Sequence, residues 1–330
     1  MIRGGAIGDF VLTLPVLAAL RRHYPGARLV VLGHPPIAQL AVAAGLADEV
    51  HSIAERALTA FFVRGGELPG KSAAFFGRFG LIISYLYDPD RVFHEHVLRC
   101  SCACLINGPH RPDESRARHA TDTYLQPLEQ LGIVGADPVP RLRIGPPGYR
   151  AGEGALARTL ALHPGSGSHR KNWPESKWEE LLDGILQHTG LDVLLVGGEA
   201  EMGRLPRLAA GRPPSRLRLA WNLPLVDLAR RLGKCVAFVG HDSGITHLAA
   251  AVGLPCVVLW GDSVQAVWQP RGDGCRVLHD PKGLAEIPVS GVLTALRWLE
   301  EEPRIDPRAQ RTSPGSIPTA PTAPPGPKGS

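Results

Sequence analysis

Short apolar runs alternate with amphipathic stretches over most of the chain. The apolar runs are rich in Val, Leu and Ile, which is typical of buried strands, and the stretches between them carry apolar residues at helical spacing. This alternation of strands and helices favours an α/β fold with parallel sheets covered by helices on both faces. The predicted strands are 1–5, 28–33, 49–53, 81–86, 102–107, 159–163, 192–196, 217–221, 235–239, 256–260 and 276–279.

Two segments rich in Pro and Gly divide the pattern. Residues 135–154 are predicted to form an interdomain linker. Residues 303–330 consist mainly of Pro, Thr, Ala, Ser and Gly, too few apolar side chains to offset the entropy of ordering, so we expect a disordered tail. We therefore predict two doubly wound, Rossmann-like domains that face each other across a cleft. Their boundaries are 1–145 and 146–302, followed by the tail at 303–330.

Two details of the first domain bear on its structure. Pro15 lies inside the amphipathic stretch 9–24 and is expected to kink or divide that helix. The first strand of a doubly wound sheet is usually central, yet only Met1–Gly5 are present to form it. We hypothesise that the natural chain begins a few residues upstream of Met1.

Charge narrows the classes of partner. The formal net charge of +5 suits an anionic partner such as a nucleotide, a phosphorylated glycolipid or a membrane surface. No basic run interleaved with aromatic residues is found, which argues against nucleic acid.

No apolar stretch is long enough to span a bilayer, so a cytoplasmic location is expected.

The cysteines are not arranged as a disulfide framework, which fits a reducing compartment. Cys100, Cys102 and Cys104 alternate as they would on one face of a strand. A metal site completed by His94, His96 or His110 is one interpretation. The spacing is not that of a zinc ribbon, and a buried free thiol is the simpler interpretation. We predict no metal and no cofactor.

Three segments combine chemistry with a place at the carboxyl end of a strand, where open α/β sheets bind ligands. The first is Gly4–Asp9, a glycine-rich turn into a helix. It is a poor dinucleotide fingerprint, because Arg3 stands where the first glycine belongs and His34 replaces the ribose-binding acid. A nicotinamide oxidoreductase is therefore disfavoured. Asp9 is either a helix cap or a general base that faces the cleft, and its position alone favours the cap.

The second segment, 162–174, runs from a strand through a loop of Gly and Ser into a helix. Hydroxyl groups of Ser166 and Ser168 and free backbone N–H groups can bind phosphate oxygens, and Lys171 can supply opposing charge. The spacing is not that of a Walker loop. A flexible loop with solvated basic residues is the alternative.

The third segment, 238–253, joins a strand to a helix through Gly-His-Asp-Ser-Gly. Ser243 and His247 are four residues apart and share a face at the positively polarised helix start, where a diphosphate is stabilised. The alternative is that Asp242 or Ser243 only caps the helix and that His247 is an ordinary surface residue.

Together the three segments resemble glycosyltransferase family 9, the ADP-heptose:lipopolysaccharide heptosyltransferases. The resemblance covers most of residues 1–300 and is carried by Gly5-Ala6-Ile7-Gly8-Asp9 with Thr13-Leu14-Pro15, by His163-Pro164-Gly165-Ser166-Gly167-Ser168 with Arg170-Lys171-Asn172-Trp173-Pro174, and by Gly240-His241-Asp242-Ser243-Gly244 with His247-Leu248-Ala249-Ala250-Ala251.

The resemblance implies a GT-B architecture and an inverting, metal-independent transfer of heptose from ADP-heptose to a lipopolysaccharide-core acceptor. By matching position Asp9 is the catalytic base, and the implied donor-binding residues are Ser166, Ser168, Lys171, Glu199, Asp242, Ser243, Gly244 and His247. His241 departs from the pattern, because the family commonly has Asn there.

The acceptor implied is an anionic glycolipid at the cytoplasmic face of the inner membrane, which would require peripheral contact with that membrane. Candidate contacts for its phosphates are Arg91, Arg99, Arg111, Arg116 and Arg118. Two alternatives remain open at this point: a family member that uses another nucleotide sugar and an acceptor outside lipopolysaccharide, and a non-catalytic nucleotide-sugar binding protein.

Overall fold

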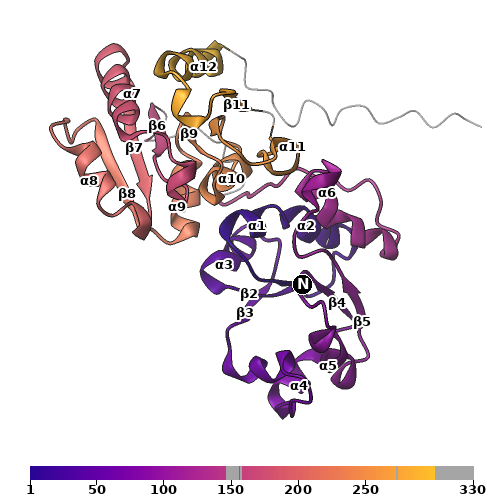
Figure 1. Ribbon diagram of the computed structural model, residues 1–330. Coiled ribbons are helices and arrows are strands. Elements are labelled where there is room, and N and C mark those ends of the chain that lie inside the picture. The colour runs from indigo at the N-terminus through magenta and orange to yellow at the C-terminus, as the bar shows by residue number, and fades with distance from the viewer. Residues whose placement is uncertain (146–155, 157, 273, 302–330) are drawn as a thin grey trace, which may run out of the picture.

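The computed structural model describes residues 1–145, 156, 158–272 and 274–301 and contains two parallel β-sheets, one in each half of the chain (Figure 1). The first sheet has the order β3-β2-β1-β4-β5, and the second has the order β11-β10-β9-β6-β7-β8. The strands are β1 Ile2–Arg3, β2 Val30–Gly33, β3 Glu49–Ser52, β4 Leu81–Ser84, β5 Cys104–Asn107, β6 Thr159–His163, β7 Asp192–Gly197, β8 Leu217–Trp221, β9 Ala237–His241, β10 Cys256–Trp260 and β11 Cys275–His279.

Helices connect the strands and cover both faces of each sheet, as the alternation of the sequence predicts. The helices are α1 Ile7–Val11, α2 Leu14–His23, α3 Pro35–Ala43, α4 Gly70–Phe76, α5 Val92–Cys100, α6 Ala120–Leu125, α7 Glu175–His188, α8 Arg204–Ala209, α9 Leu225–Leu232, α10 Gly244–Ala251, α11 Gln265–Trp268 and α12 Val289–Glu301. Among the described residues no helix is long and apolar enough to cross a membrane.

The structure confirms the two doubly wound domains and each predicted strand, with ends that move by one or two residues. The stretch 9–24 divides where Pro15 predicts a break: α1 ends at Val11, and α2 begins at Leu14 with Pro15 in its first turn. The domain boundaries stay a prediction, and both the tail at 303–330 and residues 146–154 of the Pro- and Gly-rich linker lie outside the described residues.

The cysteine interpretation needs a correction. Strand β5 begins at Cys104 and not at Cys102, and both of these side chains are exposed, so they are not buried apolar residues. All six cysteines of the chain are free thiols. In the part of the chain that the structure describes, no group of three or more His, Cys, Asp or Glu side chains is arranged to hold a metal ion.

Strand β1 is short but central. Ile2 pairs with Leu32 of β2 on one side and with Ser84 of β4 on the other. The loop after β1 therefore emerges in the middle of the carboxyl edge of the sheet, which is where α/β sheets bind ligands. In the second sheet the strand order reverses between β6 and β9, so the loops that follow these two strands open a crevice at the same kind of position.

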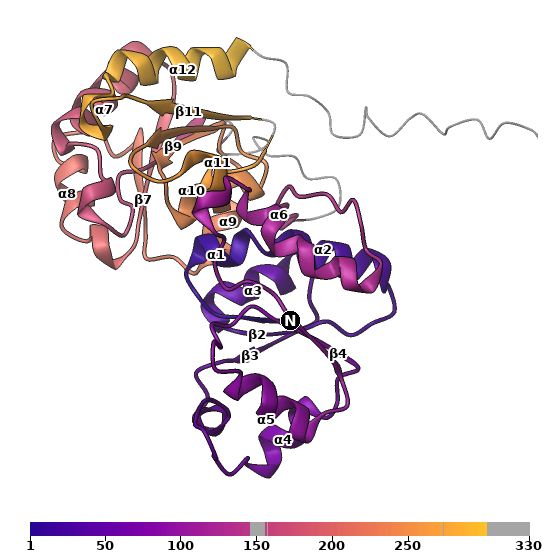
Figure 2. The same cartoon turned by 45° about the vertical axis from the view of Figure 1, so that its right-hand side comes forward.

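One apolar core runs through both domains. It joins Phe10, Leu17 and Val31 of the first half to Leu228 and Leu248 of the second. Helices α1 and α3 of the first domain pack against α10 and α9 of the second, and Figure 2 shows α1 lying between the two sheets. A backbone hydrogen bond of 2.7 Å from Leu142 N–H to the Ala251 carbonyl adds to this contact.

Candidate active site

A pocket of about 550 Å³ lies between the two domains and collects the three chemistry-bearing segments. Each site residue predicted from the sequence lines it, with the exception of Glu199. The lining residues are Ala6, Gly8, Asp9, Leu12, Arg111, Glu114, Ser166, Ser168, Arg170, Lys171, Asp242, Ser243, Gly244, His247, Asp262, Ser263 and Trp268.

Asp9 enters the pocket from the first turn of α1. The helix begins at Ile7, two residues earlier than the sequence suggests, so Ala6 is the N-cap residue and Asp9 is not. The Asp9 carboxylate nevertheless accepts a hydrogen bond of 3.1 Å from the Ala6 N–H. Its side chain is 33% exposed, so the carboxylate stabilises the helix start and still faces the cleft. Asp9 is therefore not the N-cap residue that its position favours, and its role as a general base stays a prediction.

The buried Arg3 guanidinium contacts Asp9, an interaction that sequence reasoning missed. The Arg3 side chain is 3% exposed, and its Nη2 lies 3.5 Å from Asp9 Oδ1 and donates to the Asp9 carbonyl at 3.3 Å. The same guanidinium donates to the Tyr124 hydroxyl at 2.9 Å and to the His110 carbonyl at 2.8 Å. A charged side chain is costly to bury without partners, so an arginine in a central strand could have indicated that a buried partner such as Asp9 lies nearby.

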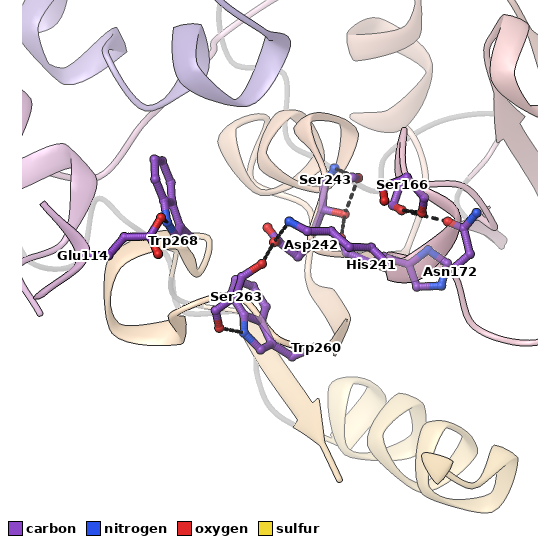
Figure 3. A network of polar contacts seen from close by, with 12 residues as sticks. Glu114, Ser166, Asn172, His241, Asp242, Ser243, Trp260, Ser263 and Trp268 are labelled. Atoms are coloured by element: carbon purple, nitrogen blue, oxygen red, sulfur yellow. Dashed lines mark hydrogen bonds and ion pairs between the residues drawn. The ribbon is translucent and has the colours of Figure 1, made fainter. Parts of the chain in front are cut away.

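The loop between β6 and α7, residues 164–173, forms one wall of the pocket and carries Ser166, Ser168 and Lys171. The Ser166 hydroxyl lies 2.7 Å from the side-chain oxygen of Asn172 and 2.9 Å from the Ser168 carbonyl, which folds the loop on itself (Figure 3). A short 3₁₀ turn at His169–Lys171 then directs Lys171 towards the second half of the site.

Lys171 meets Asp242 at the end of β9. Its Nζ donates to Asp242 Oδ2 at 2.7 Å, and the Ser263 hydroxyl donates to the same oxygen at 2.6 Å (Figure 3). An ammonium group has three hydrogens, so this ion pair leaves two donors for a further acceptor. The Lys171 side chain is 43% exposed, which keeps those donors accessible from the pocket.

The start of α10 forms the second wall. Ser243 is its N-cap, and the Ser243 hydroxyl accepts from the Thr246 N–H at 3.3 Å. The neighbouring Gly244 touches α1 so closely that a Cβ there would lie 2.7 Å from the Cβ of Ile7 and 2.8 Å from the Gly8 nitrogen. Glycine at this position therefore brings the starts of two helices, one from each domain, into the same pocket. Helix starts carry partial positive charge, which favours an anion.

Two histidines next to this helix start are uncharged at neutral pH. Burial lowers the pKa of His247 to about 4 and that of His163, at the end of β6, to about 3. His247 is 6% exposed and is not the surface residue of the alternative interpretation. A neutral imidazole offers an anion one N–H donor and no net charge, so these two histidines add no positive charge to the charge that Lys171 supplies from the opposite wall.

Glu199 is not brought to the pocket. It follows β7 and is exposed, whereas its neighbour Glu201 folds back and accepts from the Gly198 N–H at 2.8 Å. Its role in donor binding stays a prediction. Of the five arginines predicted to contact acceptor phosphates, Arg111 lines the pocket, where its guanidinium lies 5.4 Å from the centre of the Trp268 ring. Arg91, Arg99, Arg116 and Arg118 are exposed outside it.

Sequence comparison identifies the family. The family model of glycosyltransferase family 9 (heptosyltransferase) matches residues 105–283, more than half of the chain. The chain belongs to glycosyltransferase family 9. The match spans the 164–173 loop and the start of α10, which form the two pocket walls of the second domain.

Curated relatives of this family 9 chain agree with that assignment. Lipopolysaccharide heptosyltransferase 1 of Salmonella typhimurium is 36% identical over 92 residues, a segment that covers 28% of each chain. The match to this relative thus spans little more than a quarter of its length. Lipopolysaccharide heptosyltransferase 3 of Escherichia coli is 22% identical over 295 residues, which cover 80% of this chain and 83% of the relative.

Solved structures of the family share the fold. The E. coli heptosyltransferase WaaC, solved with ADP, superimposes with a TM-score of 0.70 at 19% identity, covering 90% of this chain and 98% of that one. The two-domain GT-B architecture predicted from the sequence is therefore confirmed for this family 9 protein.

Proposed function

We propose that this family 9 protein is an inverting, metal-independent glycosyltransferase that moves a heptose from ADP-heptose to a hydroxyl of a lipopolysaccharide-core acceptor. One observation carries the proposal: a single pocket joins the Asp9 carboxylate of the first domain to Lys171 and the start of α10 in the second. Two similarities support the choice of substrates. The curated relatives above are lipopolysaccharide heptosyltransferases, and the superimposed E. coli enzyme was solved with ADP.

The proposed reaction is one displacement at the anomeric carbon. Asp9 takes the proton of the acceptor hydroxyl, and the oxygen forms a bond to the anomeric carbon from the face opposite the leaving group. The bond from that carbon to the diphosphate oxygen breaks, and its electron pair leaves with ADP. Attack from the opposite face inverts the anomeric configuration.

The second domain stabilises the leaving group in this proposal. Negative charge gathers on the diphosphate as the bond breaks, and fixed donors aimed at that charge lower the barrier. We assign this task to Lys171 and to the N–H groups and hydroxyl at the start of α10, with Ser166 and Ser168 holding the phosphate oxygens. Asp242 keeps the Lys171 ammonium in place through their 2.7 Å ion pair.

Metal independence is tested directly. Because Lys171 and the helix start supply the opposing charge, we expect transfer to be unchanged after dialysis against EDTA and on addition of Mg²⁺. A loss of transfer that added Mg²⁺ restores would contradict this part of the proposal.

The main experiment combines ligand binding with turnover. Purified protein is screened by thermal shift against ADP, UDP and GDP, and transfer from ADP-heptose to a heptose-free core lipid is followed by mass spectrometry. We expect stabilisation by ADP and a product heavier by one heptose. Preference for UDP or GDP would indicate another nucleotide sugar, and binding of ADP-heptose without transfer or hydrolysis would indicate a binding protein.

A further inference from the structure

The 164–173 loop is held at both of its ends by one side chain. Strand β9 ends at His241, whose side chain is fully buried beneath the loop. The His241 Nδ1 lies 3.1 Å from the Gly165 carbonyl, at the start of the loop. The Nε2 lies 2.8 Å from the backbone nitrogen of Trp173, at the end of the loop. Figure 3 shows the ring directed towards the loop end that carries Asn172.

The partners fix the protonation of the ring. A backbone N–H can only donate, so Nε2 accepts from Trp173, and a carbonyl can only accept, so Nδ1 carries the hydrogen. Burial lowers the pKa of His241 to about 4, which leaves the ring neutral near pH 7. Neutral imidazole with its hydrogen on Nδ1 is the form that satisfies both loop ends at once.

The His241 ring and its partner Trp173 are held by further contacts. Trp173 is 1% exposed, and its indole N–H donates to the Ile287 carbonyl at 3.1 Å. The His241 ring packs edge-on against Trp178 of α7, with ring centres 5.4 Å apart. The next residue along the chain is Asp242, which holds Lys171. Residue 241 therefore links the loop to the strand end from which the ion pair is made.

We propose that His241 is a positioning residue, which holds the 164–173 loop in the conformation that binds the diphosphate of the donor. It does not line the pocket. It acts through the loop, and the inference rests on the proposed function to the extent that this loop binds the diphosphate. Without His241 the loop loses its common anchor, and the hydroxyls of Ser166 and Ser168 and the ammonium of Lys171 must be ordered when the ligand binds.

The test uses ADP binding to the full chain, measured by isothermal titration calorimetry in wild type and three variants. H241F keeps a ring but removes both hydrogen bonds, and we expect the Kd for ADP to rise roughly tenfold or more, since two buried backbone groups lose their partners. H241N keeps a nitrogen donor near the Nδ1 position, and H241Q keeps an oxygen acceptor near the Nε2 position. Each should recover part of the affinity.

The control is H96F. His96 is also buried, and its Nδ1 lies 3.1 Å from the Phe61 carbonyl, but it lies in the first domain outside the pocket. The control loses a comparable hydrogen bond, so its stability should fall while its Kd for ADP stays within twofold of wild type. Amide hydrogen exchange at 166–173 should quicken in H241F and stay unchanged in H96F.

The outcomes separate this inference from the proposed function. If wild type binds ADP and folded H241F binds it equally well, the positioning role is overturned and the proposed function stands. If H241F does not fold, equal ADP affinity of H241N, H241Q and wild type overturns the role in the same way. If wild type does not bind ADP, UDP or GDP, both the inference and the proposed function fail.

Discussion

Asp9 and Arg3 constrain each other. The buried Arg3 guanidinium holds both the carboxylate and the main-chain carbonyl of Asp9, while Tyr124 and the His110 carbonyl hold Arg3. The Tyr124 ring also lies 4.6 Å from the Arg3 guanidinium carbon, so a cation–π contact adds to the hydrogen bonds. The orientation of the proposed base is therefore set by a network that reaches across the first domain.

Replacement of Asp9 by Asn tests the base. The amide oxygen can still accept from the Ala6 N–H, so α1 should begin as before, but the amide cannot take a proton. We expect the rate of transfer in D9N to fall by about a hundred- to ten-thousand-fold, the usual contribution of a general base. The Kd for ADP should not change. Near-normal turnover of D9N would refute the role of Asp9.

Replacement of Arg3 tests the support of that base. We expect R3M to lower kcat by roughly tenfold to a hundredfold through misplacement of Asp9, with little change in the Kd for ADP, and R3K to recover part of the loss. The matched control is R212M, because Arg212 is also mostly buried and paired, with Asp183, but does not line the pocket. Equal kcat values for R3M and R212M would show that Arg3 only stabilises the fold.

Single residues also show where sequence reasoning reaches its limit. The motif residues at the strand ends could be predicted, because parallel strands bring their carboxyl ends to one edge. Arg3 was interpreted only as a misfit in a glycine fingerprint, and His241 only as a departure from Asn. Their partners, Tyr124 and Trp173, are far away in sequence, and nothing in local spacing indicates such contacts.

At the scale of elements, the contact between α1 and α10 decides how the site is assembled. The two helix starts meet at Gly8 and Gly244, where the space for a side chain is already filled. Each strand could be located to within two residues at either end, because most of the buried parallel strands are apolar runs. The start of α1 could not, because its cap is Ala6, a residue that gives no capping signal.

Replacement of Gly244 by Ala tests this contact. The new Cβ meets the Ile7 side chain and the Gly8 backbone, so α1 and α10 must move apart. We expect the free energy of unfolding of G244A to fall by about 1–3 kcal/mol, as for other overpacked interiors, and the rate of transfer to fall with it. Urea denaturation and the transfer assay measure the two effects.

The control for G244A lies in α7. At Gly184 an added Cβ meets only Leu293 at an ordinary distance of 3.6 Å, so G184A should leave transfer unchanged and stabilise the chain by about 0.5–1 kcal/mol, as Ala does inside a helix. A G244A protein as stable and active as wild type would show that the helix starts can separate without consequence.

At the scale of the whole molecule, neutral histidines make stability depend on pH. Burial lowers the pKa values of His163, His241 and His247 to about 3, 4 and 4. Between pH 6.5 and 5 the unfolded chain binds protons at these residues and the folded chain does not. The free energy of unfolding therefore rises as pH rises across this window and decreases as pH falls.

The dependence of the free energy of unfolding on pH can be measured. Each fully neutral buried histidine contributes up to about 1.4 kcal/mol per pH unit once its unfolded form is protonated. Urea midpoints at intervals from pH 7 to pH 5 should fall steadily, and H241Q should flatten the dependence. A stability that does not change between pH 6.5 and 5 would contradict the neutral assignment.

The apolar core shared by the two halves limits how the molecule can be taken apart. A chain cut between the sheets would leave Leu17 and Val31 on one fragment, and Leu228 and Leu248 on the other, without the partners that keep water away. Neither half is then expected to fold on its own, and calorimetry should record one cooperative melting event. A chimaera with a relative that exchanges one half would need the matching faces of α1, α3, α9 and α10 to be exchanged together.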